Sequence, residues 1–156
     1  MDRSGRVLPH ESERALTAPF VLRGLDHVVL RVRDPGRMER FYCEVIGCVL
    51  VRRRPDLGLT HLGAGSTMID LVDDAGPLGL KGGPPAGPDG HNMDHFCLRI
   101  TPFDASTIAA HLRAHGIEPS EAGTRFGAEG DGPSLYLDDP EGNRVELKGP
   151  SGQAVP

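Results

Sequence analysis

Four side chains of metal-binding type stand at matching places in two similar stretches of the sequence. His27 lies in the stretch DHVVLRV, and His95 lies in the stretch DHFCLRI. Later in each half a short β-rich run carries a central carboxylate, which is Asp70 in MIDLV and Glu146 in RVELK. Two imidazoles with one or two carboxylates form a ligand set suited to Fe, Mn, Ni, Co or Zn as divalent ions. The repeat therefore predicts one divalent metal ion per site.

Alternation within these runs predicts that all four side chains leave the core on the same side. Successive side chains of a strand point to opposite faces. In the first run, Val28 and Leu30 share an apolar face that must cover a helix, so His27 faces the other way. The same reasoning turns His95 and both carboxylates away from the apolar faces of their strands. A pseudo-twofold pairing of two curved half-sheets would bring these groups toward one point.

Each histidine-bearing run is followed by a helix with a recognisable start and end. Asp34 can cap the first helix, with Pro35 at its first position, and Gly47 ends it. Asp104 can cap the second helix, and Gly116 ends that one. The two halves therefore agree in the type and the order of their elements.

The repeated order of elements predicts an α+β fold. We expect two βαβββ modules that form a cupped mixed sheet with the helices on its outer face, because each half alone leaves a sheet face uncovered. The expected strands span residues 24–32, 48–54, 57–63, 66–72, 93–100, 118–123, 133–138 and 143–148.

Composition shifts along the chain predict its organisation. A stretch rich in glycine and proline lies between the two halves and has the character of a linker. The expected parts are a flexible N-terminal arm (1–20), a single domain (21–149) made of modules 21–73 and 93–149 joined by the linker 74–92, and a C-terminal tail (150–156).

Charge and hydropathy exclude several classes of partner. The chain has 156 residues and a formal net charge of −5 at pH 7, so a role in nucleic-acid binding has no electrostatic support. No apolar run approaches the roughly 18 residues of a membrane span, and no signal-peptide pattern is seen. The three cysteines do not suggest a disulfide framework. We expect a cytoplasmic protein with a small-molecule substrate, and neither nucleic acid nor a membrane as partner.

Further side chains are candidates for the wall of a substrate site. His61 could enter the cup from the third strand of its module, and an exposed or packed histidine explains it equally well. Cys97 shares the face of His95, where it would be a small wall residue or, alternatively, a thiolate. Arg99 and its repeat mate Arg31 could bind an anionic group or reach solvent. The candidate substrate-binding residues are His61, Cys97, Arg99, Arg125 and Tyr136.

The glycine-rich stretch EAGTRFGAEGDGPS, residues 121–134, contains Arg125. It has no phosphate-loop pattern and no helix follows it. Two interpretations remain open for this stretch, a mobile flap over the cup with Arg125 as an anion contact, or a plain flexible connection.

These motifs resemble the vicinal oxygen chelate superfamily, which includes glyoxalase I, methylmalonyl-CoA epimerase, extradiol dioxygenases, and fosfomycin- and bleomycin-resistance proteins. The resemblance covers residues 24–149 and rests on GLDHVVLRV, RFYCEVIGCVLV, DHFCLRI and YLDDPEGNRVELK. It implies paired modules around one divalent metal, with His27, His95 and Glu146 as ligands. The remaining ligand position falls on Asp70, which would bind directly or, being shorter than Glu, act through water.

The resemblance and the ligand set together imply a metal-dependent lyase or isomerase similar to glyoxalase I or an epimerase. Glu146 would be a metal ligand and candidate catalytic base, with Asp70 as its catalytic counterpart. One alternative is an Fe(II)-dependent extradiol-type dioxygenase, and another is a non-catalytic resistance protein that binds a small molecule or antibiotic. The resemblance also implies a homodimer, in which the site lies within one chain or is shared between two.

Overall fold

The computed structural model describes residues 25–87 and 93–154. The expected N-terminal arm (1–20) and residues 88–92 of the expected linker lie outside the described residues. The first half forms sheet A, in which the strand order is β1-β4-β3-β2. Its elements are β1 (His27–Val32), α2 (Pro35–Arg40), the π-helix η1 (Phe41–Ile46), β2 (Val49–Arg54), β3 (Leu59–Ala64) and β4 (Thr67–Asp73).

The second half forms sheet B, in which the strand order is β5-β8-β7-β6. Its elements are β5 (Phe96–Arg99), α3 (Ala105–Ala114), β6 (Gly123–Gly127), β7 (Gly130–Asp138) and β8 (Arg144–Lys148). The first strand of each half pairs in parallel with the last, β1 with β4 and β5 with β8, whereas the other pairings are antiparallel. The predicted α+β class is confirmed, and each module forms a mixed sheet of its own.

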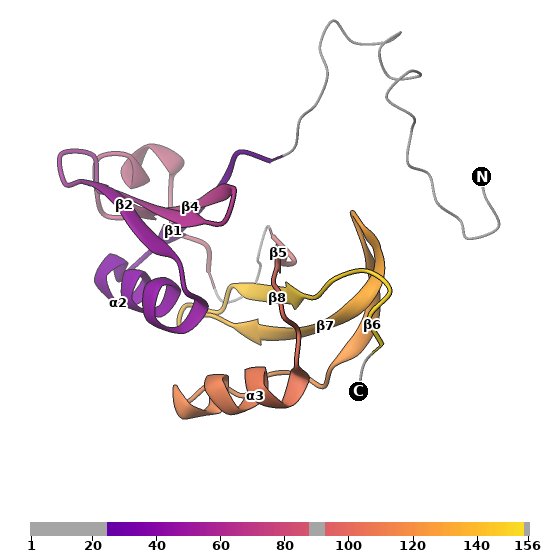
Figure 1. Cartoon of the computed structure of the whole chain (residues 1–156). Helices are drawn as coiled ribbons and strands as arrows, with labels where there is room; N and C mark the ends of the chain where they lie inside the picture. Colours follow the sequence, from indigo (N-terminus) through magenta and orange to yellow (C-terminus); the bar gives the residue numbers. More distant parts are fainter. Residues whose placement is uncertain (1–24, 88–92, 155–156) are drawn as a thin grey trace, which may run out of the picture.

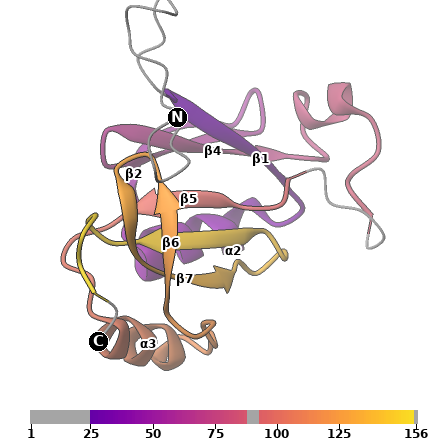
Figure 2. The same ribbon diagram turned by 90° about the vertical axis from the view of Figure 1, so that its right-hand side faces the viewer.

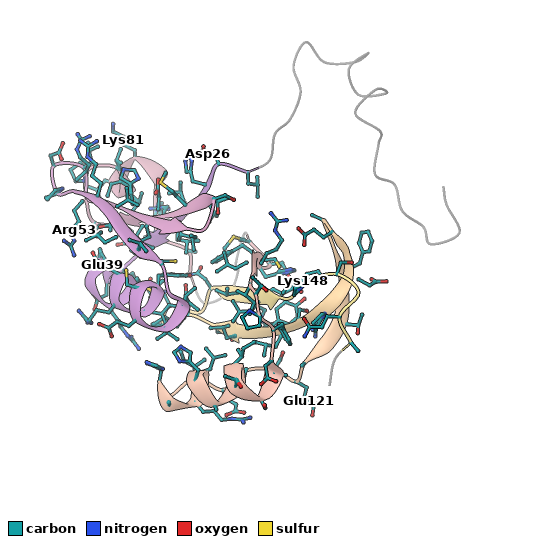
Figure 3. The ribbon with its side chains drawn as sticks, viewed as in Figure 1. Asp26, Glu39, Arg53, Lys81, Glu121 and Lys148 are labelled. Atoms are coloured by element: carbon teal, nitrogen blue, oxygen red, sulfur yellow. The ribbon has the colours of Figure 1, made fainter. Side chains whose placement is uncertain are left out.

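The helices cover one face of each sheet. In Figure 1, α2 lies beneath sheet A and α3 beneath sheet B, and Figure 2 gives the view at right angles. Arg53 of β2 donates from Nε to Glu39 of α2 at 2.9 Å, which ties the helix to an edge strand (Figure 3). The opposite faces of the two sheets are left for the candidate ligands.

The predicted helix boundaries follow from local chemistry. Asp34 accepts a hydrogen bond from the backbone N–H of Arg37 at 2.9 Å, and Asp104 accepts one from Thr107 at 2.7 Å. The π-helix η1 continues α2 and ends at Gly47, whose φ of +90° lies in the left-handed region that favours glycine.

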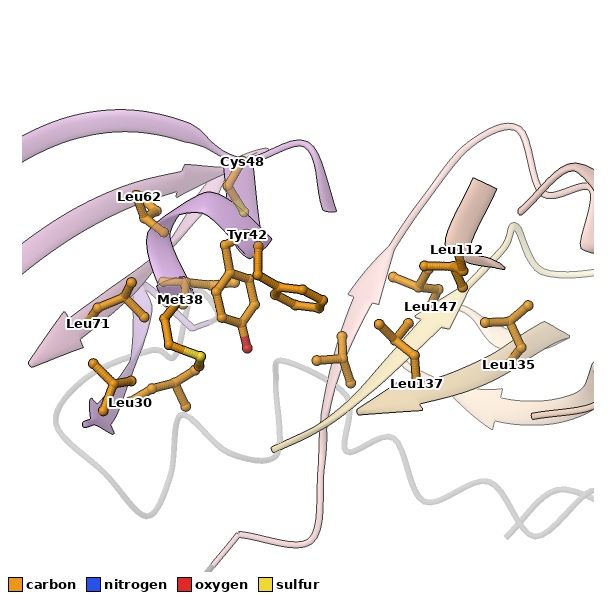
Figure 4. Close-up of a cluster of buried hydrophobic side chains, with 14 of the residues drawn as sticks. Leu30, Met38, Tyr42, Cys48, Leu62, Leu71, Leu112, Leu135, Leu137 and Leu147 are labelled. Atoms are coloured by element: carbon orange, nitrogen blue, oxygen red, sulfur yellow. The ribbon is translucent and has the colours of Figure 1, made fainter. Parts of the chain in front are cut away.

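A hydrophobic cluster fills the space between helices and sheets (Figure 4). Tyr42 of η1 lies in this cluster, and its ring centroid is 6.4 Å from that of Phe96 in β5. The Tyr42 hydroxyl donates to Asp139 at 2.8 Å, so a side chain of the first half is bonded to the second. The cluster includes Leu30, Met38, Leu62, Ile69 and Leu71 from the first half, and Leu112, Leu135, Leu137, Val145 and Leu147 from the second.

One predicted strand is wrong. The expected strand at 118–123 is largely irregular, and β6 begins only at Gly123. Residues 121–134, expected to be a flap or a flexible connection, instead contain β6 and the start of β7, joined by the two-residue turn 128–129. Gly130, with φ of +105°, closes this turn. The glycines of the stretch lack the side chains on which alternation depends, so its strands were not recognisable.

The linker is partly ordered and is held by Arg31. It contains the 3-10 helix η2 (Gly79–Gly82). The Arg31 guanidinium donates to four backbone carbonyl oxygens, those of Gly79 (3.0 Å), Gly82 (3.2 Å), Gly83 (2.6 Å) and Pro84 (3.2 Å). Neither role expected for Arg31, an anion contact or a solvent-exposed end, describes it, because its Nη1 and Nη2 donate to the linker carbonyls.

Among the helices of the described ranges, none combines the length and the apolar character that crossing a bilayer would require.

Candidate metal centre

Sheet A carries the first pair of candidate ligands. His27 is the first residue of β1, and Asp70 lies in β4, only 5% exposed. His61 of β3 is opposite Asp70 in the strand register, and its Nδ1 lies 2.8 Å from Oδ1 of Asp70. A carboxylate only accepts, so the imidazole of His61 donates this hydrogen bond. The expected wall residue His61 therefore holds Asp70 in place.

A second carboxylate orients His27. Nδ1 of His27 lies 2.7 Å from Oδ1 of Asp26, the residue that precedes it. The hydrogen bond with Asp26 raises the pKa of His27, and the nearby charge of Asp70 acts in the same direction. With Nδ1 as donor, the lone pair of the neutral ring is at Nε2, where it can bind a cation.

Sheet B carries the second pair, in the same arrangement. His95 directly precedes β5, and its Nδ1 lies 2.6 Å from Oδ2 of Asp94. Its Nε2 lies 3.3 Å from Oε2 of Glu146 in β8. Glu146 is 5% exposed, and within the described residues its buried Oε1 has no hydrogen-bond partner.

These donor atoms fit a divalent cation. When Nδ1 of His95 donates to Asp94, its Nε2 lone pair faces the carboxylate of Glu146, and a proton or a metal ion must lie between two such acceptors. The unpartnered Oε1 of Glu146 is costly to bury unless it receives a ligand. The second half-site therefore has the chemistry of a metal ligand pair.

The surroundings of Glu146 include two other expected site residues. Cys97 and Tyr136 flank Glu146 in the register of β5, β8 and β7. Burial, and secondarily the charge of Glu146, raises the pKa of the Cys97 thiol to about 11, which favours the thiol over a thiolate. The ring of Tyr136 meets that of His95 edge-on at 5.3 Å between centroids.

The two arginines of the expected wall have specific contacts. Arg99 forms an ion pair with Glu129 of the β6–β7 turn at 2.5 Å. Arg125 lies in β6, where its Nη1 donates to the backbone oxygen of Ser134 at 2.8 Å. Its guanidinium also lies over the ring of Tyr136, 4.5 Å from the centroid. Arg125 is thus fixed against the sheet.

The four candidate ligands form two pairs. His27 is close enough to Asp70 to respond to its charge, and His95 contacts Glu146. Within residues 25–87 and 93–154 of one chain, no three or more His, Cys, Asp or Glu residues are grouped so that they could hold a metal ion. Each sheet therefore supplies half of a ligand set.

Sequence reasoning missed the two aspartates that orient the histidines. Asp26 and Asp94 stand directly before His27 and His95, so the signal was the dipeptide Asp-His, present in both repeats. It also missed that His61 and Tyr136 are equivalent, because each lies opposite the carboxylate of its sheet. The strand register, which the sequence does not state, was needed to pair them.

Comparisons with known proteins agree with this architecture. Residues 24–147 match the family described as the Glyoxalase/Bleomycin resistance protein/Dioxygenase superfamily. An integron cassette protein from the mobile metagenome of V. Pseudocholerae is 26% identical, with a TM-score of 0.68 over 85% of this chain and 98% of that one.

Two further solved structures share the fold at lower identity. A lactoylglutathione lyase from Agrobacterium tumefaciens is 21% identical, with a TM-score of 0.59 over 82% of this chain and 94% of that one. A fosfomycin resistance protein from Listeria monocytogenes is 16% identical, with a TM-score of 0.61 over 85% and 97%. The chain belongs to the glyoxalase, bleomycin resistance protein and dioxygenase superfamily.

Proposed function

We propose that this protein is a divalent-metal-dependent enzyme that acts on a small substrate chelated through two adjacent oxygens, in the manner of glyoxalase I or an epimerase. The observation that carries the proposal is the buried carboxylate of Glu146. Among the described residues one of its oxygens has no hydrogen-bond partner, and the other faces Nε2 of His95 at 3.3 Å. Such a carboxylate can hold a metal ion, and it can also accept a proton from a bound substrate.

The chain's own residues have distinct roles in this proposal. His27, His95 and Glu146 would hold the ion, and Asp26 and Asp94 keep each imidazole in the tautomer that presents Nε2. When bound, the ion supplies Lewis-acid stabilisation of an enolate that develops on the chelated substrate.

The two carboxylates would share the movement of the substrate proton. Glu146 is the base, and Asp70, its counterpart in sheet A, is held by His61 at 2.8 Å so that its orientation is fixed. Both groups are 5% exposed, so a proton that they carry is shielded from exchange with bulk water.

The proposed site is shared between two chains of a homodimer. Each sheet supplies one histidine and one carboxylate, and the described part of one chain groups no third ligand with either pair. If sheet A of one chain faces sheet B of its partner, a twofold axis completes two equivalent sites.

An Fe(II)-dependent dioxygenase is the second candidate. It would use the same ligands as the first candidate, His27, His95 and Glu146, because His61 already donates to Oδ1 of Asp70. Two histidines and one carboxylate with open positions suit Fe(II) and oxygen.

Metal analysis combined with two assays tests the proposal. We expect protein purified without added metal to bind nickel, cobalt or zinc and to isomerise the hemithioacetal of methylglyoxal and glutathione. Bound iron with oxygen uptake on a catechol panel would instead favour the dioxygenase.

A matched pair of variants controls this experiment. Glu146→Gln should lose the metal, whereas Glu121→Gln, at an exposed position, should retain it. Wild-type protein that binds no divalent ion at micromolar concentration would contradict the proposed function.

A further inference from the structure

Sheet B carries two cationic side chains beside the second half-site that form no ion pair with a carboxylate of the described residues. Lys148 of β8 lies two positions beyond Glu146, so both side chains leave the same face of the strand. Arg125 of β6 lies on that face as well, since its guanidinium lies over the ring of Tyr136, the residue opposite Glu146 in the register of β7 and β8. Lys148 also donates from Nζ to the backbone oxygen of Arg125 at 2.7 Å. The ion pairs among the described residues include neither Lys148 nor Arg125. We call Lys148 and Arg125 the cationic pair.

Lys148 is buried although it is charged. Its exposed fraction is 5%, and an ammonium group that leaves water is stable only if it is paired and hydrogen-bonded. The group has three N–H donors, and within the described residues one hydrogen bond is formed, to the Arg125 carbonyl. Two donors and the full charge therefore remain for a ligand.

Two glycines make the space in which this side chain lies. A Cβ at Gly127 would come within 2.6 Å of Cε of Lys148, and a Cβ at Gly132 within 2.9 Å of its Nζ. The lysine therefore extends from β8 across β7 toward β6, along a path that any larger residue at these positions would block. Its ammonium group is held at a defined place on the sheet.

Arg125 is held at the same place by independent contacts. Its Nη1 donates to the backbone oxygen and to Oγ of Ser134, the residue opposite Lys148 in the register of β7 and β8. Its guanidinium lies over the ring of Tyr136, which in turn contacts His95. Tyr136 therefore lies between Arg125 of the cationic pair and the candidate metal ligand His95.

The strand geometry gives the separation between the cationic pair and the candidate metal ligand Glu146. Lys148 lies about 7 Å from Glu146 along β8, and its side chain extends across β7 to the Arg125 carbonyl in β6. An anion bound at its ammonium group would therefore lie on the order of 10 Å from Glu146, within the reach of one small molecule. We propose that the substrate carries an anionic carboxylate or phosphoryl group that binds Lys148 and Arg125. This group is additional to the chelating oxygens, and the inference rests on the proposed function.

Anion titration of matched lysine variants tests this inference. Lys148→Met keeps the aliphatic chain and removes the charge, and Lys81→Met makes the same change at an exposed lysine of η2. Figure 3 shows Lys148 at sheet B and Lys81 on the far side of sheet A. Inorganic phosphate and malonate are titrated separately into each protein by calorimetry, so that the phosphoryl and carboxylate sources are distinguished.

We expect Lys148→Met to bind anions more weakly than wild type, and Lys81→Met to bind them with wild-type affinity. Wild type should bind at least one of the two anions saturably, one per site, and Lys148→Met should bind it at least about tenfold more weakly, as expected for loss of a charge-assisted hydrogen bond. Equal affinity in wild type and Lys148→Met, or no saturable binding in wild type, would overturn the inference.

Two additional measurements keep the result interpretable. If circular dichroism shows that Lys148→Met does not fold, Arg125→Gln takes its place with the same expected loss. Zinc titration of the same samples should give equal metal affinity in wild type and Lys148→Met. A metal site without an anion site contradicts only this inference, whereas absence of metal binding in wild type contradicts the proposed function.

Discussion

The two Asp-His dipeptides are the smallest unit of the candidate site. In each, the aspartate accepts from Nδ1 of the following histidine, at 2.7 Å for Asp26 and His27 and at 2.6 Å for Asp94 and His95. A hydrogen bond of this kind sets the tautomer and raises the basicity of the other nitrogen. Orientation of the ligand is therefore encoded beside the ligand itself, and it needs no long-range contact.

The unequal carboxylates lead to a first prediction. Glu146→Ala should abolish tight metal binding, because it removes a ligand. Asp70→Ala should weaken binding no more than about 10- to 100-fold, the range typical of groups that support a ligand. The reason is that Oδ1 of Asp70 is already engaged by His61. Zinc or iron titration of both variants in the same buffer measures the difference, and equal, near-complete loss in both would show that Asp70 is a direct ligand.

Tyr42 gives a second prediction, which concerns stability. Its buried hydroxyl donates to Asp139 at 2.8 Å, so Tyr42→Phe should lower the free energy of unfolding by about 1–3 kcal/mol. Chemical denaturation at neutral pH measures this loss. Metal binding should be unchanged, since Tyr42 lies on the opposite side of the sheets from the candidate ligands.

The same residue predicts a pH dependence. Burial, followed by the charge and hydrogen bond of Asp139, raises the pKa of Tyr42 far above its ordinary value of 10.0. Above about pH 10 the unfolded chain releases this proton and the folded chain keeps it, so the free energy of unfolding should fall by about 1.4 kcal/mol per pH unit. Denaturation curves between pH 10 and 11 should fall more steeply for wild type than for Tyr42→Phe, by up to about 1.4 kcal/mol per pH unit; identical slopes would contradict the assignment.

Individual site residues could be predicted from the sequence only where the same type of residue recurs in both halves. His27, His95, Asp70 and Glu146 were recognisable because each appears at an equivalent place in the two halves. Lys148 was not recognisable, because its role depends on space left by glycines in β6 and β7. Contacts that one repeat has and the other lacks leave no pattern in a single sequence.

Among the helices and strands, those with local capping signals were predicted correctly, and the glycine-rich hairpin, which lacks such signals, was not. Caps, prolines and positive-φ glycines act within a few residues, and the helices after Asp34 and Asp104 are accordingly where they were expected. The β6–β7 hairpin was mislocated because glycines replace the alternating side chains of its strands. β7 of this hairpin pairs with β8, a long-range contact that the sequence does not show.

The ordered part of the linker gives a prediction at this scale. The Arg31 guanidinium binds four carbonyl oxygens between Gly79 and Pro84, so Arg31→Met should release this segment while β1 remains paired with β4. Hydrogen exchange should become faster at Leu80 and Lys81, whose N–H groups are bonded to Gly76 and Leu78, and should be unchanged in β4. Unchanged protection at Leu80 and Lys81 would show that the segment is ordered without Arg31.

At the scale of the whole molecule, the two modules turn their helices toward one continuous core. The cluster includes Met38 and Tyr42 from the first helical segment and Leu112 from α3. His111 of α3 also contacts the backbone oxygen of Val45 in η1, at 2.9 Å. Because the helix-bearing faces meet in this way, the ligand-bearing faces point away from the shared core, and each can accept a partner of its own.

This arrangement gives the last prediction, a test of the shared site by complementation. His27→Ala damages sheet A and leaves sheet B intact, and His95→Ala does the reverse. If sites form between sheet A of one chain and sheet B of its partner, a mixed dimer has one site with both halves damaged and one with both intact. Neither variant alone should bind the metal tightly, whereas an equal mixture refolded together should recover about a quarter of the wild-type sites, because half of the randomly formed dimers are mixed.

Metal content per chain after gel filtration measures this recovery, and light scattering of the same peak gives the mass of the dimer. A mixture of His27→Ala with Glu146→Ala serves as a second mixed pair, and it should recover metal to the same extent, because these residues also belong to different sheets. A mixture of His95→Ala with Glu146→Ala should recover none, since both changes damage sheet B. If the His27→Ala and His95→Ala mixture binds no more than its components, the site is not shared in this way.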